Sequence, residues 1–128
     1  MSSVTGVLLV AAGAALGGAF RYLVALPLNR WGGLSLWGLP AGTWMVNVLG
    51  SLAFGYVAAV YADREWVRLF VLVGLLGGFT TFSSFSHETL GLLQTGKSGV
   101  ALAYITLSVL VCVVAAWAGM SLGTLRKG

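Results

Sequence analysis

Two otherwise apolar segments of the chain carry polar side chains at intervals of one helical turn. The residues concerned are Thr43, Asn47 and Ser51 in the first segment, and Tyr104, Ser108 and Cys112 in the second. Because a spacing of four residues places side chains on one face of a helix, each set predicts a polar stripe. A single Ser or Thr in an apolar helix usually bonds its own backbone one turn earlier. The amide of Asn47, with two donors and an acceptor, is costly to leave unpaired in hydrocarbon, so we expect it to face a partner helix or a wet path.

The apolar segment 71–88 has an unusual centre, in which Gly77 and Gly78 are followed by Thr80, Thr81 and a serine-rich run. Gly is a poor helix former, and the β-branched Thr residues that follow also have low helix propensity. We therefore predict two half-helices that meet near the middle of the bilayer. Backbone exposed at that depth is tolerated where it is buried in protein or lines a cavity, and its carbonyls would suit a hard cation such as Na⁺. The alternative is a glycine-rich kink that serves packing alone.

Phe82 and Phe85 are three residues apart and therefore lie on similar faces of a helix. Both are embedded among Thr and Ser, which argues against a lipid-facing aromatic stripe. An aromatic ring has a positive edge, so edge-on rings would favour a small anion without trapping it by a full charge. Glu88 either snorkels to the interface or lines a vestibule. Arg21 is either a snorkelling anchor or a source of positive potential at an anion entrance.

The composition indicates the class of protein in which these residues must be positioned. Of 128 residues, 59% are hydrophobic and 8% are charged, against roughly 25% charged in an average soluble domain. Mean hydropathy is +0.97. So few polar groups cannot cover a soluble globule, which excludes a soluble enzyme, a nucleic-acid-binding domain and a disordered tail. The single Cys112 excludes an internal disulfide and a cysteine-based metal site.

The seven basic and three acidic residues are spaced so that four long stretches carry no charge. A membrane-spanning helix needs about 20 mostly apolar residues. We therefore predict an all-α integral membrane protein, in one domain covering residues 1–128, with spans at about 4–26, 40–61, 67–95 and 98–123. Pro27 and the pair Gly32 and Gly33 mark the first connection, and Pro40 begins the second span. The first stretch lacks a positive start and is long for a cleaved signal peptide, so we interpret it as a retained helix.

The basic residues predict almost no preferred orientation in the membrane. With four spans, the basic residues on the side of the N-terminus are Arg64, Arg68, Arg126 and Lys127, and those on the other side are Arg21, Arg30 and Lys97. Because such residues favour the cytoplasmic side, this tally indicates either a misjudged boundary or a chain that inserts both ways and forms an antiparallel dimer. Four helices leave little room for an aqueous path, so a transport function would use a subunit interface. Pairs of small residues permit close approach of helices, and the chain has four of them: Gly13/Gly17, Ala14/Gly18, Gly74/Gly78 and Gly119/Gly123. The pairs do not identify which helix surfaces meet.

Three motifs make the chain resemble the CrcB/Fluc family of fluoride channels. They are GGAFRY at residues 17–22, GTWMVNVLGS at 42–51, and GGFTTFSSFS at 77–86 with Glu88 after it. The third is the most specific, and all three occur in order on a four-span chain of this length. The resemblance thus covers essentially the whole chain. Two positions depart from the family pattern, because Ser84 stands where Thr is frequent and Cys112 where a hydroxyl is common.

The resemblance implies a dual-topology antiparallel homodimer in the bacterial inner or plasma membrane, with two pores through which fluoride leaves the cytoplasm passively. It implies that the backbone carbonyls of Gly77 and Thr80 bind a structural Na⁺ at the dimer centre. Phe82 and Phe85 would line the pores edge-on, and Asn47 would be a pore-side donor. The other positions implied along the pathway or its vestibule are Thr43, Ser83, Ser84, Tyr104, Ser108, Arg21 and Glu88. The implied partners are fluoride, the lipid bilayer and a second copy of the chain, but no nucleic acid.

The residues themselves agree with a channel for a small, strongly hydrated anion, whose water must be replaced by donors that still let it leave. No titratable group lies at the centre of a span, which favours a passive channel over a pump. A small multidrug transporter, the main alternative, would carry an embedded Glu in its first helix, where the only charge here is Arg21. A non-transporting assembly subunit would explain the glycine pairs but not the polar stripes. The sequence contains no recognisable nucleophile–base pair and no metal-ligand cluster that would indicate an enzyme.

Overall fold

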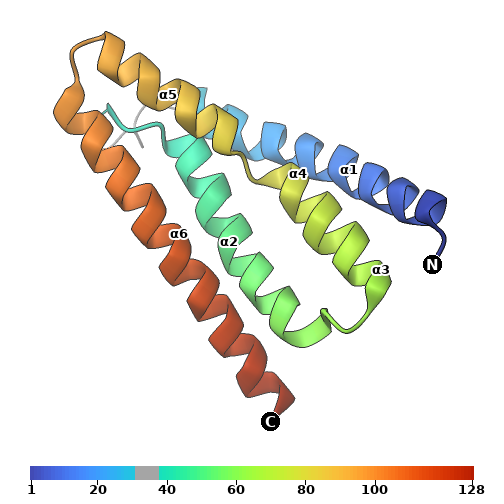
Figure 1. The fold of residues 1–128 in the computed structure, drawn as a ribbon. Coiled ribbons are helices and arrows are strands. Elements are labelled where there is room, and N and C mark those ends of the chain that lie inside the picture. Colours follow the sequence, from blue (N-terminus) through green and yellow to red (C-terminus); the bar gives the residue numbers. More distant parts are fainter. Residues whose placement is uncertain (31–37) are drawn as a thin grey trace.

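The computed structural model describes residues 1–30 and 38–128, which form a bundle of long helices (Figure 1). Three spans are single helices, namely α1 (Ser3–Arg30), α2 (Ala41–Tyr61) and α6 (Ser98–Lys127). The third span, Glu65–Gln94, is built from α3 (Glu65–Val67), the π-helix η3 (Arg68–Leu76), α4 (Gly77–Phe79) and α5 (Phe82–Gln94). All four spans are long and apolar enough to cross a membrane, which confirms the predicted all-helical, four-span architecture.

Two helix ends differ from the predicted spans. The first helix does not stop before Pro27 but continues through it to Arg30. Proline removes one helical hydrogen bond, and this loss is tolerated near a helix end, where the last carbonyls lack helical partners anyway. The last helix continues beyond residue 123 to Lys127, because Gly123 still packs on α2. The predicted Gly32 and Gly33 connection lies outside the described residues.

The helices form two close pairs that lie side by side. In one pair α1 runs along η3 and α4, and in the other α2 runs along α6 (Figure 1). The N-terminus, the connection from α2 to α3 and the C-terminus lie at the same end of the bundle. This is the arrangement expected when four consecutive spans cross the same layer.

Glycine pairs bring both helix pairs into backbone contact. A side chain on Gly17 of α1 would collide with the backbone of Leu75 and Gly78, and one on Gly119 of α6 would collide with the Leu52 carbonyl of α2. Small residues permit this approach, so the predicted glycine pairs act inside the subunit. Gly18, by contrast, has no neighbour within the described part of the chain that an added side chain would meet.

The exterior of the bundle is strongly apolar, whereas its core is small. The largest fully buried side chains are Tyr104 and Val46. Large apolar side chains such as Val4, Leu102 and Leu125 are instead exposed. A bilayer requires this distribution, because lipid tails solvate apolar side chains while every backbone group must be paired within the protein.

The third span is interrupted between α4 and α5. Thr80 has φ −77° and ψ 157°, and Thr81 has φ −150° and ψ 116°, so both residues are extended. The N–H of Thr80 still donates to the Leu76 carbonyl at 3.0 Å, and α5 begins at Phe82. The π-helix that precedes the interruption was not predicted from the sequence.

Candidate functional site

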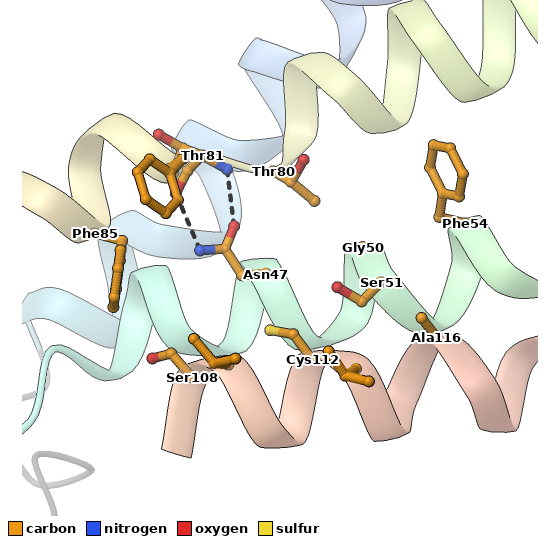
Figure 2. A pocket seen from close by; sticks show the side chains of 13 residues that line it. Asn47, Gly50, Ser51, Phe54, Thr80, Thr81, Phe85, Ser108, Cys112 and Ala116 are labelled. Atoms are coloured by element: carbon orange, nitrogen blue, oxygen red, sulfur yellow. Dashed lines mark hydrogen bonds between the residues drawn. The ribbon is translucent and has the colours of Figure 1, made fainter. Parts of the chain in front are cut away.

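The side chain of Asn47 on α2 pairs with the backbone at the interruption. Its Nδ2 donates to the Thr81 carbonyl at 3.0 Å, and the Thr81 N–H donates to Asn47 Oδ1 at 2.8 Å (Figure 2). One amide therefore replaces the helical acceptor of the Thr81 N–H, and it adds a second donor to the Thr81 carbonyl, which as the N-cap carbonyl also accepts the first hydrogen bond of α5. Asn47 was expected to face either a partner helix or a wet path. It faces a partner helix, and it also lines a groove.

Thr81 begins the second half of the span. Its Oγ1 accepts a hydrogen bond from the N–H of Ser84 at 3.2 Å and donates to the Ser84 hydroxyl at 3.0 Å. This is an N-cap, which satisfies one of the free N–H groups at the start of α5. Ser83 Oγ lies 3.3 Å from the same Thr81 oxygen, so three hydroxyl groups gather at this helix end.

The contacts of Thr81 with Asn47 and Ser84 remove the helical hydrogen-bond donors of two carbonyl groups at the interruption. In a continuous helix the Gly77 carbonyl would accept from the N–H of Thr81, and the Thr80 carbonyl would accept from the N–H of Ser84. The Thr81 N–H donates to Asn47 instead, and the Ser84 N–H donates to the Thr81 hydroxyl. The carbonyls of Gly77 and Thr80 have thus lost their helical donors. Gly77 is exposed and Thr80 is half-buried.

A groove of about 430 Å³ lies beside the interruption, between α2, α6 and the first turn of α5 (Figure 2). Its lining residues are Asn47, Gly50, Ser51, Phe54, Thr80, Thr81, Phe82, Phe85, Ser108, Val109, Cys112, Val113 and Ala116. Ser108 is only 7% exposed, and its buried Oγ has no hydrogen-bond partner among the described residues. Cys112 is half-buried one turn further along α6. Ser108 therefore contributes a buried donor with nothing to donate to.

Aromatic rings extend from the groove toward the centre of the bundle. The ring centroids of Phe82 and Phe85 are 5.5 Å apart with the planes tilted by 47°, and those of Phe85 and Tyr104 are 5.2 Å apart. Phe82 is 78% exposed, whereas Phe85 is half-buried and Tyr104 is buried. Phe82 and Phe85 line the groove, whereas Tyr104 does not.

A second cavity of about 360 Å³ shares Thr81 with the groove as a lining residue. It is lined by Gly18, Arg21, Tyr22, Ala25, Thr43, Val46, Thr81, Ser84 and Glu88. Glu88 accepts a hydrogen bond from Thr43 Oγ1 at 2.6 Å and from the Tyr104 hydroxyl at 2.8 Å. Its carboxylate therefore joins α2, α5 and α6, and Glu88 lines a cavity that Arg21 also lines.

The structure brings most of the predicted site residues together, in two groups around Thr81. The groove collects Asn47, Thr80, Phe82, Phe85 and Ser108, and the second cavity collects Arg21, Thr43, Ser84 and Glu88. Tyr104 contacts both groups through Phe85 and Glu88. Ser83 is exposed beside Thr81, and Gly77 lies on α4 outside both cavities. Thr81 itself was missed as a site residue, although a Thr placed before a helical segment is a recognised N-cap signal.

The fold and this site define a class, a multi-pass membrane protein whose polar groups converge on an interrupted span. The family model described as CrcB-like protein, Camphor Resistance (CrcB), matches residues 8–120. The chain therefore belongs to the CrcB family, which confirms the resemblance seen in its motifs.

Curated relatives cover nearly the whole chain. A relative from Agrobacterium fabrum is 42% identical over 119 residues, which are 90% of this chain and 93% of the relative. One from Nitrobacter winogradskyi is 42% identical over 122 residues, covering 92% and 94%. One from Elusimicrobium minutum is 44% identical over 112 residues, covering 87% of each. All three are named fluoride-specific ion channel FluC.

Proposed function

We propose that this protein is a fluoride channel of the bacterial inner or plasma membrane, through which fluoride leaves the cytoplasm passively. The names of its relatives support fluoride as the ion. The observation that carries the proposal is the buried Ser108 hydroxyl, which has no partner among the described residues and lines the groove beside Phe85 and Asn47. A buried donor without an acceptor is unfavourable unless a ligand supplies one, and fluoride is a strong acceptor of small size.

The groove offers fluoride neutral donors and ring edges in place of its water. Ser108 and Ser51 contribute hydroxyl groups, and the tilted pair Phe82 and Phe85 contributes positive ring edges. An anion held by such groups can leave again, because none of the described residues that line the groove carries a full positive charge. Arg21 lines the second cavity instead, where its charge would attract an anion toward the entrance.

The proposed assembly is an antiparallel homodimer of dual topology with two pores, in which the interruption of the third span lies near mid-membrane. The groove is open on one side of the single subunit, and Phe82, at 78% exposure, is among its most exposed lining residues. A second copy placed over this face would close each groove into a pore. The nearly even distribution of basic residues between the two ends supports insertion in both orientations.

The proposal includes a structural Na⁺ at the dimer centre, held by the carbonyls of Gly77 and Thr80. The donor set fits such an ion, because carbonyl oxygens suit hard cations and both groups have lost their helical donors. Na⁺ would supply positive charge that holds these carbonyls together. The chain's own contribution is to keep the two carbonyls free, through Asn47 and the Thr81 cap.

Fluoride efflux from liposomes tests the proposed function. We expect liposomes that contain the purified protein and are loaded with fluoride to release it, as followed with a fluoride electrode, and liposomes loaded with chloride to retain chloride. The substitution Ser108→Ala should reduce fluoride release by about tenfold to a hundredfold, since one hydrogen bond to a charged group contributes roughly 1.5–3 kcal/mol.

The matched control for this experiment is Ser121→Ala, on the same helix. The Ser121 hydroxyl is exposed and donates to the Trp117 carbonyl of its own helix at 2.9 Å, so its removal should leave release unchanged. The proposed function is wrong if the unmodified protein releases no fluoride, or releases chloride at the same rate.

A further inference from the structure

We propose that the end of the bundle where α2 and α6 terminate binds the phosphate of an anionic phospholipid. The site is a cluster of two phenols and three cations, here called the basic–aromatic cluster, formed by Tyr56, Tyr61, Arg64, Arg126 and Lys127. None of these residues lines the groove or the second cavity. The inference therefore does not rest on the proposed fluoride pathway.

Tyrosine side chains orient both guanidinium groups of the cluster. Arg126 Nη1 donates to the Tyr56 hydroxyl, and Arg126 also lies close to Tyr61. The Arg64 guanidinium carbon lies 5.8 Å from the centroid of the Tyr61 ring, a cation–π distance. Because a neutral phenol holds an arginine without cancelling its charge, both guanidinium groups remain available to a phosphate, which they match in a bidentate geometry.

The carboxylates at this end of the bundle do not neutralise its positive charge. Lys127 Nζ lies 3.5 Å from Asp63 Oδ2, but the Asp63 side chain is 81% exposed, so this pair is weak. Glu65, the next acidic residue, pairs with the N-terminal amine of Met1 at 3.5 Å. Arg68 follows one turn after Arg64 and is exposed. The side chains of the cluster thus carry three positive charges beside one exposed carboxylate.

The surroundings favour a lipid over free phosphate. Leu122 lies one turn before Arg126 on α6, and Leu125 is adjacent to it; both are exposed, Leu125 to 78%. These exposed apolar side chains provide a surface for acyl chains close to cations that would meet a headgroup. The ends of α2 and α6 lie at one end of the bundle (Figure 1), where a spanning helix meets the anionic headgroup layer.

Native mass spectrometry of the purified full chain, stripped of lipid and then given equal amounts of phosphatidylglycerol and phosphatidylcholine, tests the site. We expect the unmodified protein to retain phosphatidylglycerol preferentially. The double variant Arg64→Gln/Arg126→Gln should lose about tenfold of that retention, and Arg64→Lys/Arg126→Lys should lose less because it keeps the charge but not the planar fork. Lys97→Gln, an exposed cation between α5 and α6, is the matched control and should retain the lipid fully.

Three outcomes would overturn the proposal. They are equal retention of the two lipids by the unmodified protein, unchanged retention by the double glutamine variant, and displacement of phosphatidylglycerol by inorganic phosphate at millimolar concentration, which would assign the site to free phosphate. Thermal unfolding followed by circular dichroism identifies a misfolded variant. If the glutamine variant is misfolded, the variant Arg64→Lys/Arg126→Lys and the comparison of the two lipids on the unmodified protein still test the proposal.

Discussion

At the scale of single residues, Asn47 performs a task that helices normally perform with their own backbone. Its amide pairs with both the N–H and the carbonyl of Thr81 across 34 positions of sequence. This gives the Thr81 N–H a partner at an extended link inside an apolar span, where an unpaired buried N–H would be costly. The same amide lines the groove, so structural support and the candidate ion pathway depend on one side chain.

Replacing Asn47→Ala should destabilise the protein and abolish fluoride release. The substitution leaves the Thr81 N–H without its partner, at about 1–3 kcal/mol, while the Thr81 carbonyl keeps the first helical donor of α5. We therefore expect the free energy of unfolding in detergent to fall by about 1–3 kcal/mol. Asn47→Asp keeps an acceptor for the Thr81 N–H but places a negative charge in the groove. It should therefore recover part of the stability and none of the release, and full stability of Asn47→Ala would contradict this role.

The carboxylate of Glu88 should couple Thr43 to Tyr104 energetically. Thr43→Val and Tyr104→Phe each remove one hydrogen bond to the carboxylate, for about 1.5–3 kcal/mol, which unfolding in denaturant would measure. In a Glu88→Ala background both substitutions should become nearly neutral, because the shared acceptor is gone. Thr95→Val, whose hydroxyl bonds carbonyls of its own helix, controls for loss of a hydroxyl. Equal costs with and without Glu88 would show that no coupling exists.

At the scale of helices, glycine determines which elements lie against one another. Gly13 and Gly17 bring α1 onto η3 and α4, while Gly55 and Gly119 bring α2 onto α6. These contacts join backbones directly, so they are sensitive to a single added methyl group. They also position the site, since the groove lies between α2, α6 and the start of α5.

Gly55→Ala and Gly91→Ala should therefore have opposite effects on stability. A Cβ on Gly55 would collide with the Ala116 carbonyl on α6, whereas one on Gly91 of α5 would meet no neighbour. We expect the first to cost about 1–3 kcal/mol through separation of the helices. The second should stabilise the helix by about 0.5–1 kcal/mol, because alanine loses less backbone freedom than glycine. Unfolding of the two variants in detergent gives the comparison, and equal effects would contradict close packing of α2 on α6.

At the scale of the whole molecule, the described part of the subunit presents an apolar exterior, into which the groove beside the interruption of the third span opens. Val109 and Val113 on α6 border that groove and are exposed, and Val114 is exposed without bordering it. The groove-bearing face is thus distinguishable from the rest of the apolar surface. In the proposed dimer, this face would contact the second copy and the rest would contact lipid.

Val113→Trp should prevent dimer formation, whereas Val114→Trp should not. The two residues are neighbours of the same type, so the pair separates the position on the helix from the size of the substitution. Single-molecule photobleaching of labelled protein in liposomes would count subunits, with one bleaching step expected for Val113→Trp and two for Val114→Trp. Two steps for both variants would place the subunit contact on another face.

Much of the architecture was predictable because hydrocarbon permits few solutions. An apolar segment of about 20 residues in a bilayer must pair its backbone internally, and the four predicted spans agree with the observed helices except near Pro27 and after residue 123. The polar residues at helical spacing and the motif at 77–86 also located the candidate site. The π-helix was not predictable in this way, because the segment Arg68–Leu76 is apolar at every position after Arg68 and so shows no periodicity that would distinguish a π-helix from an α-helix.

The sequence alone determined that this is a four-span membrane protein of the CrcB family with polar groups concentrated on its second, third and fourth spans. Only the tertiary structure decided how those groups are paired. Spacing along a helix defines a face, but the rotation of that face toward another helix depends on packing between distant segments. For this reason the partners of Asn47 and Glu88, and the use of the glycine pairs within the subunit, follow from how the four helices pack.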